Sequence, residues 1–275
     1  MTSNLNVCLF PMPIVWGEKQ KNLECLEKAV EGVHPDTDLM ILPEMFSTGF
    51  LTSDKESVRE YAEKNSGETI EFLKRLASRH CMAIAGSFIA DTGGSLFNRA
   101  FFIESGGDAV FADKRHLFTM AGENKTFSRG DSRLKIRYRG WNISMVVCYD
   151  IRFPVWCRNV DNEYDLLIAV ANWPKVRVDA WNQLLKARAI ENLSYVCGVD
   201  CNGTDLNGYE YDGSSHVFDF KGKDITLSNE SSPFRYASLS YDKLQSFRQK
   251  FPAWNDADKF KINFEDDFKT LFNNK

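Results

Sequence analysis

Short apolar runs, rich in β-branched and aromatic residues, recur along the whole chain and alternate with stretches of helical periodicity. Each run has the length of a strand. Several of the intervening stretches place apolar residues three or four positions apart, as on one face of a helix. Strands that alternate with helices predict an α/β layer architecture. The expected strands are 5–10, 38–42, 82–89, 98–103, 142–147, 165–171, 195–200, 214–220 and 235–240, and the expected helices are 17–32, 67–79 and 178–192.

Residues 82–103 depart from this alternation, because they read as two strands joined by a turn at 91–94, Asp-Thr-Gly-Gly. An antiparallel hairpin within an α/β pattern indicates a mixed sheet, or two sheets packed face to face with helices outside. The chain of 275 residues shows no internal repeat and no Pro/Gly/Ser-rich linker. A chain of this length buries a large core without disulfides, so we expect one domain.

Charge and cysteine usage narrow the class of protein. The 34 basic and 38 acidic side chains give a net charge of −4, which argues against nucleic acid as the main partner. No run of about 18 apolar residues could cross a bilayer, and the first residues lack the features of a secretory signal. The seven cysteines show no zinc-type spacing. We therefore expect a cytoplasmic protein with reduced thiols and no metal.

The last residues carry a regular aromatic pattern. Phe260, Phe264, Phe268 and Phe272 recur every four positions, so on a helix they would follow one face. Such a helix could pack on its own domain or cross onto a second subunit, because an exposed apolar stripe is a liability on a monomer. We therefore expect a domain over residues 1–259 and a C-terminal aromatic tail over residues 260–275.

Cys148 stands where an apolar strand ends and a helix is expected to begin near Pro154. A sharp turn between the two would expose the thiol and direct backbone N–H groups, such as that of Tyr149, at one point, where they could hold an oxyanion. The alternative is an ordinary buried cysteine. The other six cysteines lie in no comparable motif, and we interpret them as packing residues.

Two more charged residues follow expected strands. Glu44, after Leu-Pro and before Met-Phe, is expected to be partly desolvated, which raises a carboxyl pKa and makes the group a usable base. Its alternative is a surface glutamate. Lys114 begins the basic run Lys-Arg-His, which is either solvated or holds one inward lysine that stabilises negative charge. His116 in that run has no local signature of a catalytic base.

Together, the motifs LPE at Glu44, DKRHLF at Lys114 and VVCYDIRFP at Cys148 resemble the nitrilase superfamily of carbon–nitrogen hydrolases in order and spacing. The resemblance runs from about residue 5 to 259 and includes NWP at 172–174, KARAIEN at 186–192 and the ending FPAW. This last group is similar to the ω-amidase branch. The resemblance implies a four-layer αββα sandwich of two mixed β-sheets flanked by helices, no cofactor, and a homodimer or higher homo-oligomer.

The resemblance also implies roles for individual residues. Cys148 matches the nucleophile, Glu44 the general base, and Lys114, with the Tyr149 N–H, the oxyanion site. Glu123 matches a second glutamate of the family site, the alternative being a loop carboxylate. A free thiol has a pKa near 8.5, so it is mostly protonated at neutral pH. We expect the nearby base and lysine to raise its reactive fraction.

The branch implies a substrate, namely a small 2-oxo acid with a terminal amide, such as 2-oxoglutaramate or 2-oxosuccinamate. Arg152 is the candidate for binding its carboxylate, because a guanidinium binds carboxylates bidentately. The alternative for Arg152 is an ion pair with Asp150. Trp173 and Phe46 are pocket walls or core residues.

Two other functions stay open from the sequence. The same fold and catalytic residues could act on another small amide, an N-carbamoyl compound or a nitrile, because substrate choice lies in the pocket. A non-catalytic relative that binds a metabolite is the alternative of another class. Among the partners, we expect only the small-molecule substrate and copies of the same chain.

Overall fold

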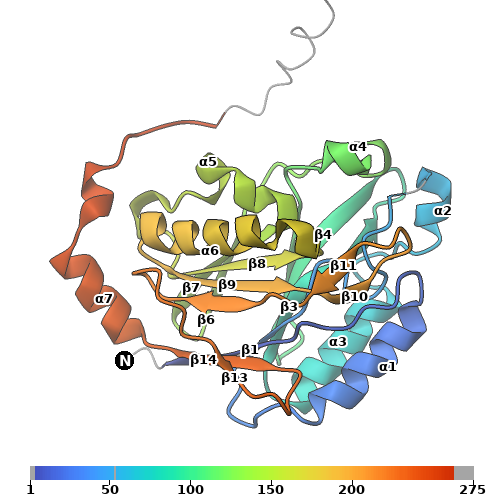
Figure 1. Cartoon of the computed structure of the whole chain (residues 1–275), viewed down its shortest axis with the longest axis horizontal. Helices are drawn as coiled ribbons and strands as arrows, with labels where there is room; N and C mark the ends of the chain where they lie inside the picture. Colours follow the sequence, from blue (N-terminus) through green and yellow to red (C-terminus); the bar gives the residue numbers. More distant parts are fainter. Residues whose placement is uncertain (1–3, 53, 263–275) are drawn as a thin grey trace, which may run out of the picture.

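Two large mixed β-sheets form the centre of the computed structural model, which describes residues 4–52 and 54–262 (Figure 1). The first sheet has the order β13 (Leu227–Ser228), β14 (Arg235–Leu239), β1 (Leu5–Leu9), β2 (Leu39–Ile41), β3 (Ala83–Asp91), β4 (Leu96–Ile103), β5 (Ala109–Asp113). The second has the order β12 (His216–Phe218), β9 (Tyr195–Asp200), β8 (Leu166–Ala171), β7 (Trp141–Val147), β6 (Leu134–Tyr138). A hairpin, β10 (Asn202–Thr204) and β11 (Glu210–Asp212), lies beside them.

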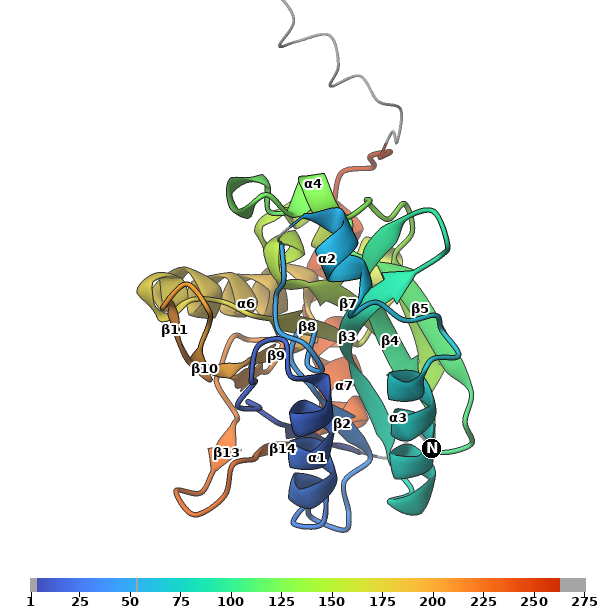
Figure 2. The ribbon, with the colours of Figure 1, turned by 90° about the vertical axis from the view of Figure 1, so that its right-hand side faces the viewer.

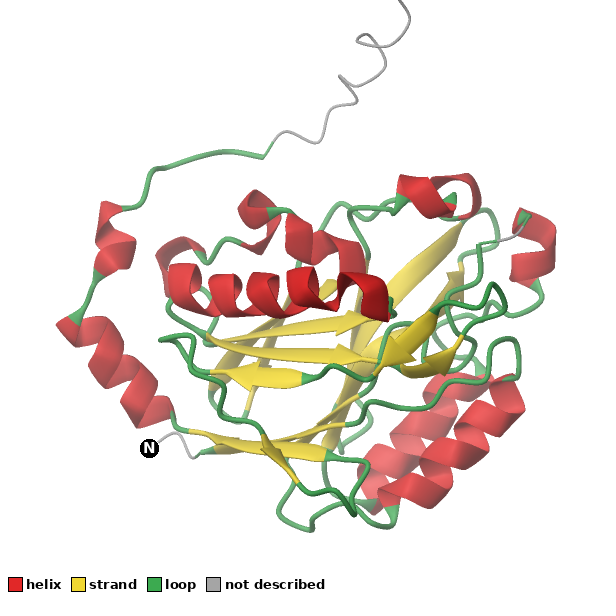
Figure 3. Ribbon diagram, in the orientation of Figure 1, coloured by secondary structure: helices red, strands yellow, loops and turns green. Residues whose placement is uncertain are grey.

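The sheets pack face to face, and helices cover their outer faces (Figures 2 and 3). The helices are α1 (Lys19–Val30), α2 (Lys55–Arg59), α3 (Glu68–Arg79), α4 (Glu123–Thr126), α5 (Pro154–Cys157), α6 (Val178–Asn192) and α7 (Tyr241–Lys250). Helices α1 and α3 cover the first sheet, and α5 and α6 cover the second. The predicted four-layer αββα sandwich is confirmed.

Alternation along the strands explains why the sheets bury both faces. In β1, Leu5, Val7 and Leu9 point into the core between the sheets, whereas Cys8 points to the helices on the other side. Side chains alternate in this way along any strand, and a strand covered on both faces is apolar throughout. The central strand β8, for example, is buried at all its residues.

The expected strands and helices all have counterparts, including the antiparallel hairpin of β3 and β4. The sequence reading missed β5, β6, β10, β11, β13, α2, α4 and α7. It was wrong about Cys81, which is exposed and has a positive φ of 53° at the turn before β3. Of the tail, residues 260–262 show no helix, and Phe264, Phe268 and Phe272 lie outside the described residues.

Two groups of parallel strands bring chemically important loops together. Strands β1, β2 and β3 are parallel in the first sheet, and β7, β8 and β9 are parallel in the second. Glu44 follows β2, Cys148 follows β7, and Asn172 follows β8. Loops at the carboxyl ends of parallel strands meet at one edge of a sheet. No helix within the described residues is long and apolar enough to cross a membrane.

Candidate active site

Cys148 lies in a sharp turn at the end of β7. Its φ is 47°, in the left-handed region, and a 3-10 turn over Cys148–Arg152 leads to Pro154 at the start of α5. A residue other than glycine adopts this conformation at a cost of about 1–2 kcal/mol, which the surrounding structure must offset. Asp150 contributes to this, because its carboxylate accepts the Val147 N–H at 3.2 Å. The turn expected from the sequence is confirmed.

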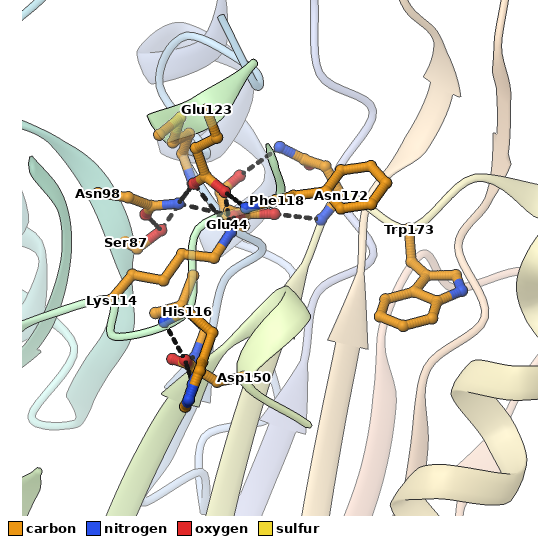
Figure 4. A network of polar contacts seen from close by, with 12 residues as sticks. Glu44, Ser87, Asn98, Lys114, His116, Phe118, Glu123, Asp150, Asn172 and Trp173 are labelled. Atoms are coloured by element: carbon orange, nitrogen blue, oxygen red, sulfur yellow. Dashed lines mark hydrogen bonds and ion pairs between the residues drawn. The ribbon is translucent and has the colours of Figure 1, made fainter. Parts of the chain in front are cut away.

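Lys114, just beyond β5, reaches between two buried carboxylates (Figure 4). Its Nζ lies 2.9 Å from Glu44 Oε1, and 2.9 and 3.0 Å from the two oxygens of Glu123. The side chain of Lys114 is 1% exposed and those of both glutamates are 0% exposed. The surface alternatives for Glu44 and Lys114 are therefore wrong, as is the loop-carboxylate alternative for Glu123.

Three uncharged residues hold this ionic cluster, and the sequence reading missed all of them. Asn98 Nδ2 donates to Glu44 Oε1 at 2.7 Å and to Glu123 Oε1 at 3.3 Å. The Ser87 hydroxyl donates to Asn98 Oδ1 at 3.0 Å, which fixes the orientation of the amide. The backbone N–H of Asn172 donates to Glu44 Oε2 at 2.9 Å. Asn172 begins the NWP segment, which belongs to the resemblance, but that motif does not indicate a contact with Glu44.

The two oxygens of Glu44 are thereby distinguished. Oε1 accepts hydrogen bonds from Lys114 and Asn98, whereas Oε2 accepts one from Asn172. A carboxylate oxygen has two lone-pair positions. Glu44 also acts on the Cys148 thiol, whose pKa it raises. Oε2 is thus the oxygen with an acceptor position open for the thiol proton.

Burial and the neighbouring charges keep the thiol protonated. Desolvation and then Glu44 raise the pKa of Cys148 well above its usual value, and Lys114 only partly opposes them. Of the two groups expected to raise the reactive fraction of the thiol, Lys114 lowers its pKa, whereas Glu44 raises it. The thiol must lose its proton to Glu44 as it attacks.

Glu123 and Lys114 also have shifted pKa values. Burial and the Glu44 charge raise the pKa of Glu123, although Lys114 opposes them. Burial alone would lower the pKa of Lys114, but Glu123 and Glu44 raise it well above its usual value. Lys114 therefore stays charged, and its charge remains available to a developing anion.

The candidate substrate residues lie in different surroundings. Arg152 is exposed, and its guanidinium carbon lies 4.8 Å from the centroid of the Trp173 ring. Asp150 instead binds the backbone N–H and ring of His116, each at 2.8 Å, so the structure does not support an Arg152–Asp150 pair. The Trp173 ring is almost fully buried in the core cluster beneath α6.

Phe46 and Tyr149 flank the site differently. Phe46 is buried on the helix-covered side of the first sheet, and its ring centroid lies 5.9 Å from that of Phe101. This favours the core alternative over a pocket wall for Phe46. Tyr149 is half-buried, with its ring between Phe118 and Phe153.

Within residues 4–52 and 54–262, no group of His, Cys, Asp and Glu side chains could hold a metal ion.

Comparison with known proteins identifies the family to which this fold and this set of buried residues belong. The family model for carbon-nitrogen hydrolases matches residues 6–249, so the chain belongs to the carbon–nitrogen hydrolase family. The chain is 40% identical over 259 residues to the omega-amidase YafV of Escherichia coli K12, covering 94% of this chain and 98% of that protein. It is 28% identical over 249 residues to the 2-oxoglutaramate amidase of Bacillus subtilis, covering 90% and 95%.

Solved structures agree with this assignment. A CN-hydrolase superfamily protein from Xanthomonas campestris superposes with a TM-score of 0.89 at 36% identity, covering 94% of this chain and 99% of that one. Nit3 of Saccharomyces cerevisiae, a member of branch 10 of the nitrilase superfamily, gives 0.78 at 25% identity, covering 91% and 95%. The resemblance to the nitrilase superfamily is confirmed.

Proposed function

We propose that this chain is an omega-amidase that hydrolyses the terminal amide of a small 2-oxo acid, such as 2-oxoglutaramate or 2-oxosuccinamate, to the dicarboxylate and ammonia. The observation that carries the proposal is the buried cluster of Lys114 between Glu44 and Glu123, beside the thiol of Cys148. The 40% identity to an omega-amidase over almost the whole chain supports the choice of substrate.

In the first half of the reaction, Cys148 Sγ attacks the amide carbon while Glu44 Oε2 takes the thiol proton. The carbonyl π electrons move to oxygen, which is held by Lys114 Nζ and the Tyr149 N–H. One N–H of Lys114 can serve both oxygens of Glu123, because they are almost equidistant from Nζ. A second N–H of Lys114 donates to Glu44, and the third is left to donate to the oxyanion. Such donors act strongly where water is excluded.

The buried site keeps its total charge through this step. Before attack, Glu44 and Glu123 are negative and Lys114 is positive. After attack, the negative charge of Glu44 has been replaced by that of the oxyanion. The barrier therefore contains no cost for bringing a new charge into a low-dielectric interior, which would otherwise be large.

In the second half, Glu44 gives its proton to the amide nitrogen, the C–N bond breaks, and ammonia leaves. A thioester remains on Cys148. Water then attacks the thioester carbon and loses a proton to Glu44 or Glu123. When the tetrahedral intermediate collapses, the C–S bond breaks, Sγ regains the proton, and the carboxylic acid product is released.

We further propose that Arg152 binds the carboxylate at the far end of the substrate. Its guanidinium is exposed and lies over the buried Trp173 ring, which leaves its edge open to a carboxylate. Arg152→Lys should raise KM for 2-oxoglutaramate about tenfold or more, because a hydrogen bond to a charged group contributes about 1.5–3 kcal/mol. Arg75, which lies over the Phe72 ring on α3, supplies the matched control Arg75→Lys. An unchanged KM in Arg152→Lys refutes the role of Arg152.

A substrate panel read by ammonia release tests the function itself. We expect the wild-type protein to release ammonia faster from 2-oxoglutaramate than from other linear amides, N-carbamoyl amino acids or nitriles. Cys148→Ala and Cys148→Ser should release none. Faster turnover of an N-carbamoyl amino acid would overturn the substrate assignment, and activity in Cys148→Ala would overturn the thioester mechanism.

We propose that the enzyme works in the cytoplasm as a homodimer or higher homo-oligomer. All seven cysteines are free, which suits a reducing compartment and a thiol nucleophile. We also retain the division into a domain over residues 1–259 and a tail over residues 260–275 that reaches a subunit interface. Deleting the tail should then lower the mass measured by sedimentation, and an unchanged mass and melting temperature would refute its role.

A further inference from the structure

Asp150, two residues after Cys148, is a buried carboxylate with three hydrogen-bond donors around it (Figure 4). Its Oδ2 accepts the N–H of Val147, the last residue of β7. Its Oδ1 lies 2.8 Å from the backbone nitrogen of His116 and 2.8 Å from the ring Nδ1 of the same residue. Because a carboxylate oxygen only accepts, Nδ1 of His116 carries the hydrogen.

The His116 ring is also fixed by aromatic contacts. It stacks on Phe153 with ring centroids 3.7 Å apart and planes 7° apart, and its edge faces Trp156 at 5.8 Å and 82°. Both aromatic residues belong to the segment that follows the Cys148 turn. The ring therefore contacts this segment both through its hydrogen bond and through its face.

These contacts join two sheets. His116 lies two residues beyond Lys114, which extends from β5 of the first sheet, whereas Asp150 lies two residues beyond Cys148, at the end of β7 in the second sheet. A single carboxylate thus ties the segment that carries the cation to the turn that carries the nucleophile. The same segment continues to Phe118, whose N–H donates to Glu123 Oε2 at 2.5 Å.

We propose that His116 is a positioning residue that, through Asp150, sets the placement of Lys114 relative to Cys148. This inference rests on the proposed function, because it assumes amide attack by Cys148. His116 does not itself contact the reacting atoms in this scheme. It acts by holding the thiol and the ammonium group at the separation that attack and oxyanion binding require.

The proposal can be tested because only Nδ1 of His116, and not Nε2, makes the hydrogen bond to Asp150. An asparagine amide can replace Nδ1–H in geometry, whereas a glutamine amide reaches the position of Nε2. His116→Gln should lower kcat about 100-fold, since a 1 Å misplacement of reacting groups can have that effect. KM should stay unchanged, because the substrate contacts are intact. His116→Asn should restore most of the lost kcat.

The chain contains a matched control. His216 Nδ1 lies 2.7 Å from Asp224 Oδ2, and its side chain is about as exposed as that of His116. His216 lies on β12 and Asp224 follows that strand, and neither belongs to the buried cluster of Glu44, Lys114 and Glu123. His216→Gln and His216→Asn should leave kcat unchanged, and a loss of kcat in His216→Gln as large as that in His116→Gln overturns the proposal.

A second readout separates this inference from the substrate assignment. Alkylation of Cys148 by iodoacetamide, followed on its peptide by mass spectrometry, depends on the thiol and its base but not on the natural substrate. We expect the rate to fall in His116→Gln and to recover in His116→Asn. If both variants alkylate and turn over like the wild type, or if asparagine is no better than glutamine, the proposal is overturned. If the wild type does not hydrolyse 2-oxoglutaramate but the alkylation pattern holds, only the proposed function fails.

Discussion

Replacing Lys114 by methionine would expose the electrostatics of the buried cluster. Methionine keeps most of the length of the side chain but removes the charge. The two glutamates, both fully buried, would then face each other across the amide of Asn98 alone. Removing one partner of a buried ion pair costs about 3–5 kcal/mol, because it leaves an uncompensated charge.

The exposed pair Lys175–Glu210, 3.2 Å apart, sets the scale for comparison. Exposed pairs contribute at most about 1 kcal/mol. We therefore expect Lys114→Met to lose at least three times as much free energy of unfolding as Lys175→Met. Urea titrations followed by tryptophan fluorescence measure both.

The loss should depend on pH with a defined sign. Without the lysine, the two buried carboxyl groups retain a proton that the unfolded chain releases above about pH 4.3. The folded variant then binds more protons than the unfolded chain. Its stability relative to the wild type should therefore fall as pH rises from 5 to 8, by at most about 1.4 kcal/mol per pH unit. Adding Glu123→Gln should remove that slope.

Two outcomes would refute this reasoning about the cluster. A loss below about 1 kcal/mol would mean that the lysine does not compensate the carboxylates. A loss that is constant from pH 5 to pH 8 would mean that the two carboxyl groups do not share a proton in the variant.

Two further predictions concern the frame around the site. Gly130→Ala should destabilise the protein and lower kcat, because the new Cβ would lie 2.0 Å from the carbonyl oxygen of Asp113, next to Lys114. Gly94→Ala is the control, since its Cβ meets nothing within 4 Å. Equal melting temperatures of the two variants would contradict this prediction. Arg248→Met should lower the free energy of unfolding, measured with urea, by about 3–5 kcal/mol, because the buried Asp165, 2.7 Å away, loses its cation. KM should stay unaltered. A loss of stability under about 1 kcal/mol would contradict this prediction.

Glu44, Lys114 and Cys148 were predictable because the three motifs that contain them resemble the nitrilase superfamily in order and spacing. Glu44 and Cys148 also stand where expected strands end, with residue types that carry chemistry. Asn98 could not be found in the same way. It lies within an expected strand, where nothing in the sequence shows that its amide faces two carboxylates from distant segments.

The strands and helices that were not predicted from the sequence were missed for physical reasons as well. Strand β6 has the sequence LKIRY, whose strict alternation of apolar and charged residues would have predicted it. Helix α7 packs on the core through only three apolar residues, Tyr241, Leu244 and Phe247. Its other buried residue, Arg248, is held by its pairing with Asp165. A partner distant in sequence leaves no periodic signal.

The division of the site between two sheets has a consequence for folding. Glu44, Asn98 and Lys114 come from the first sheet and its loops, whereas Cys148 and Asn172 come from the second. Neither half contains both the nucleophile and Lys114, so a collapsed intermediate with two formed but unpaired sheets has no catalytic activity. Recovery of ammonia release during refolding should therefore lag behind recovery of secondary structure, and enzymatic activity reports on the docking of one half of the molecule onto the other.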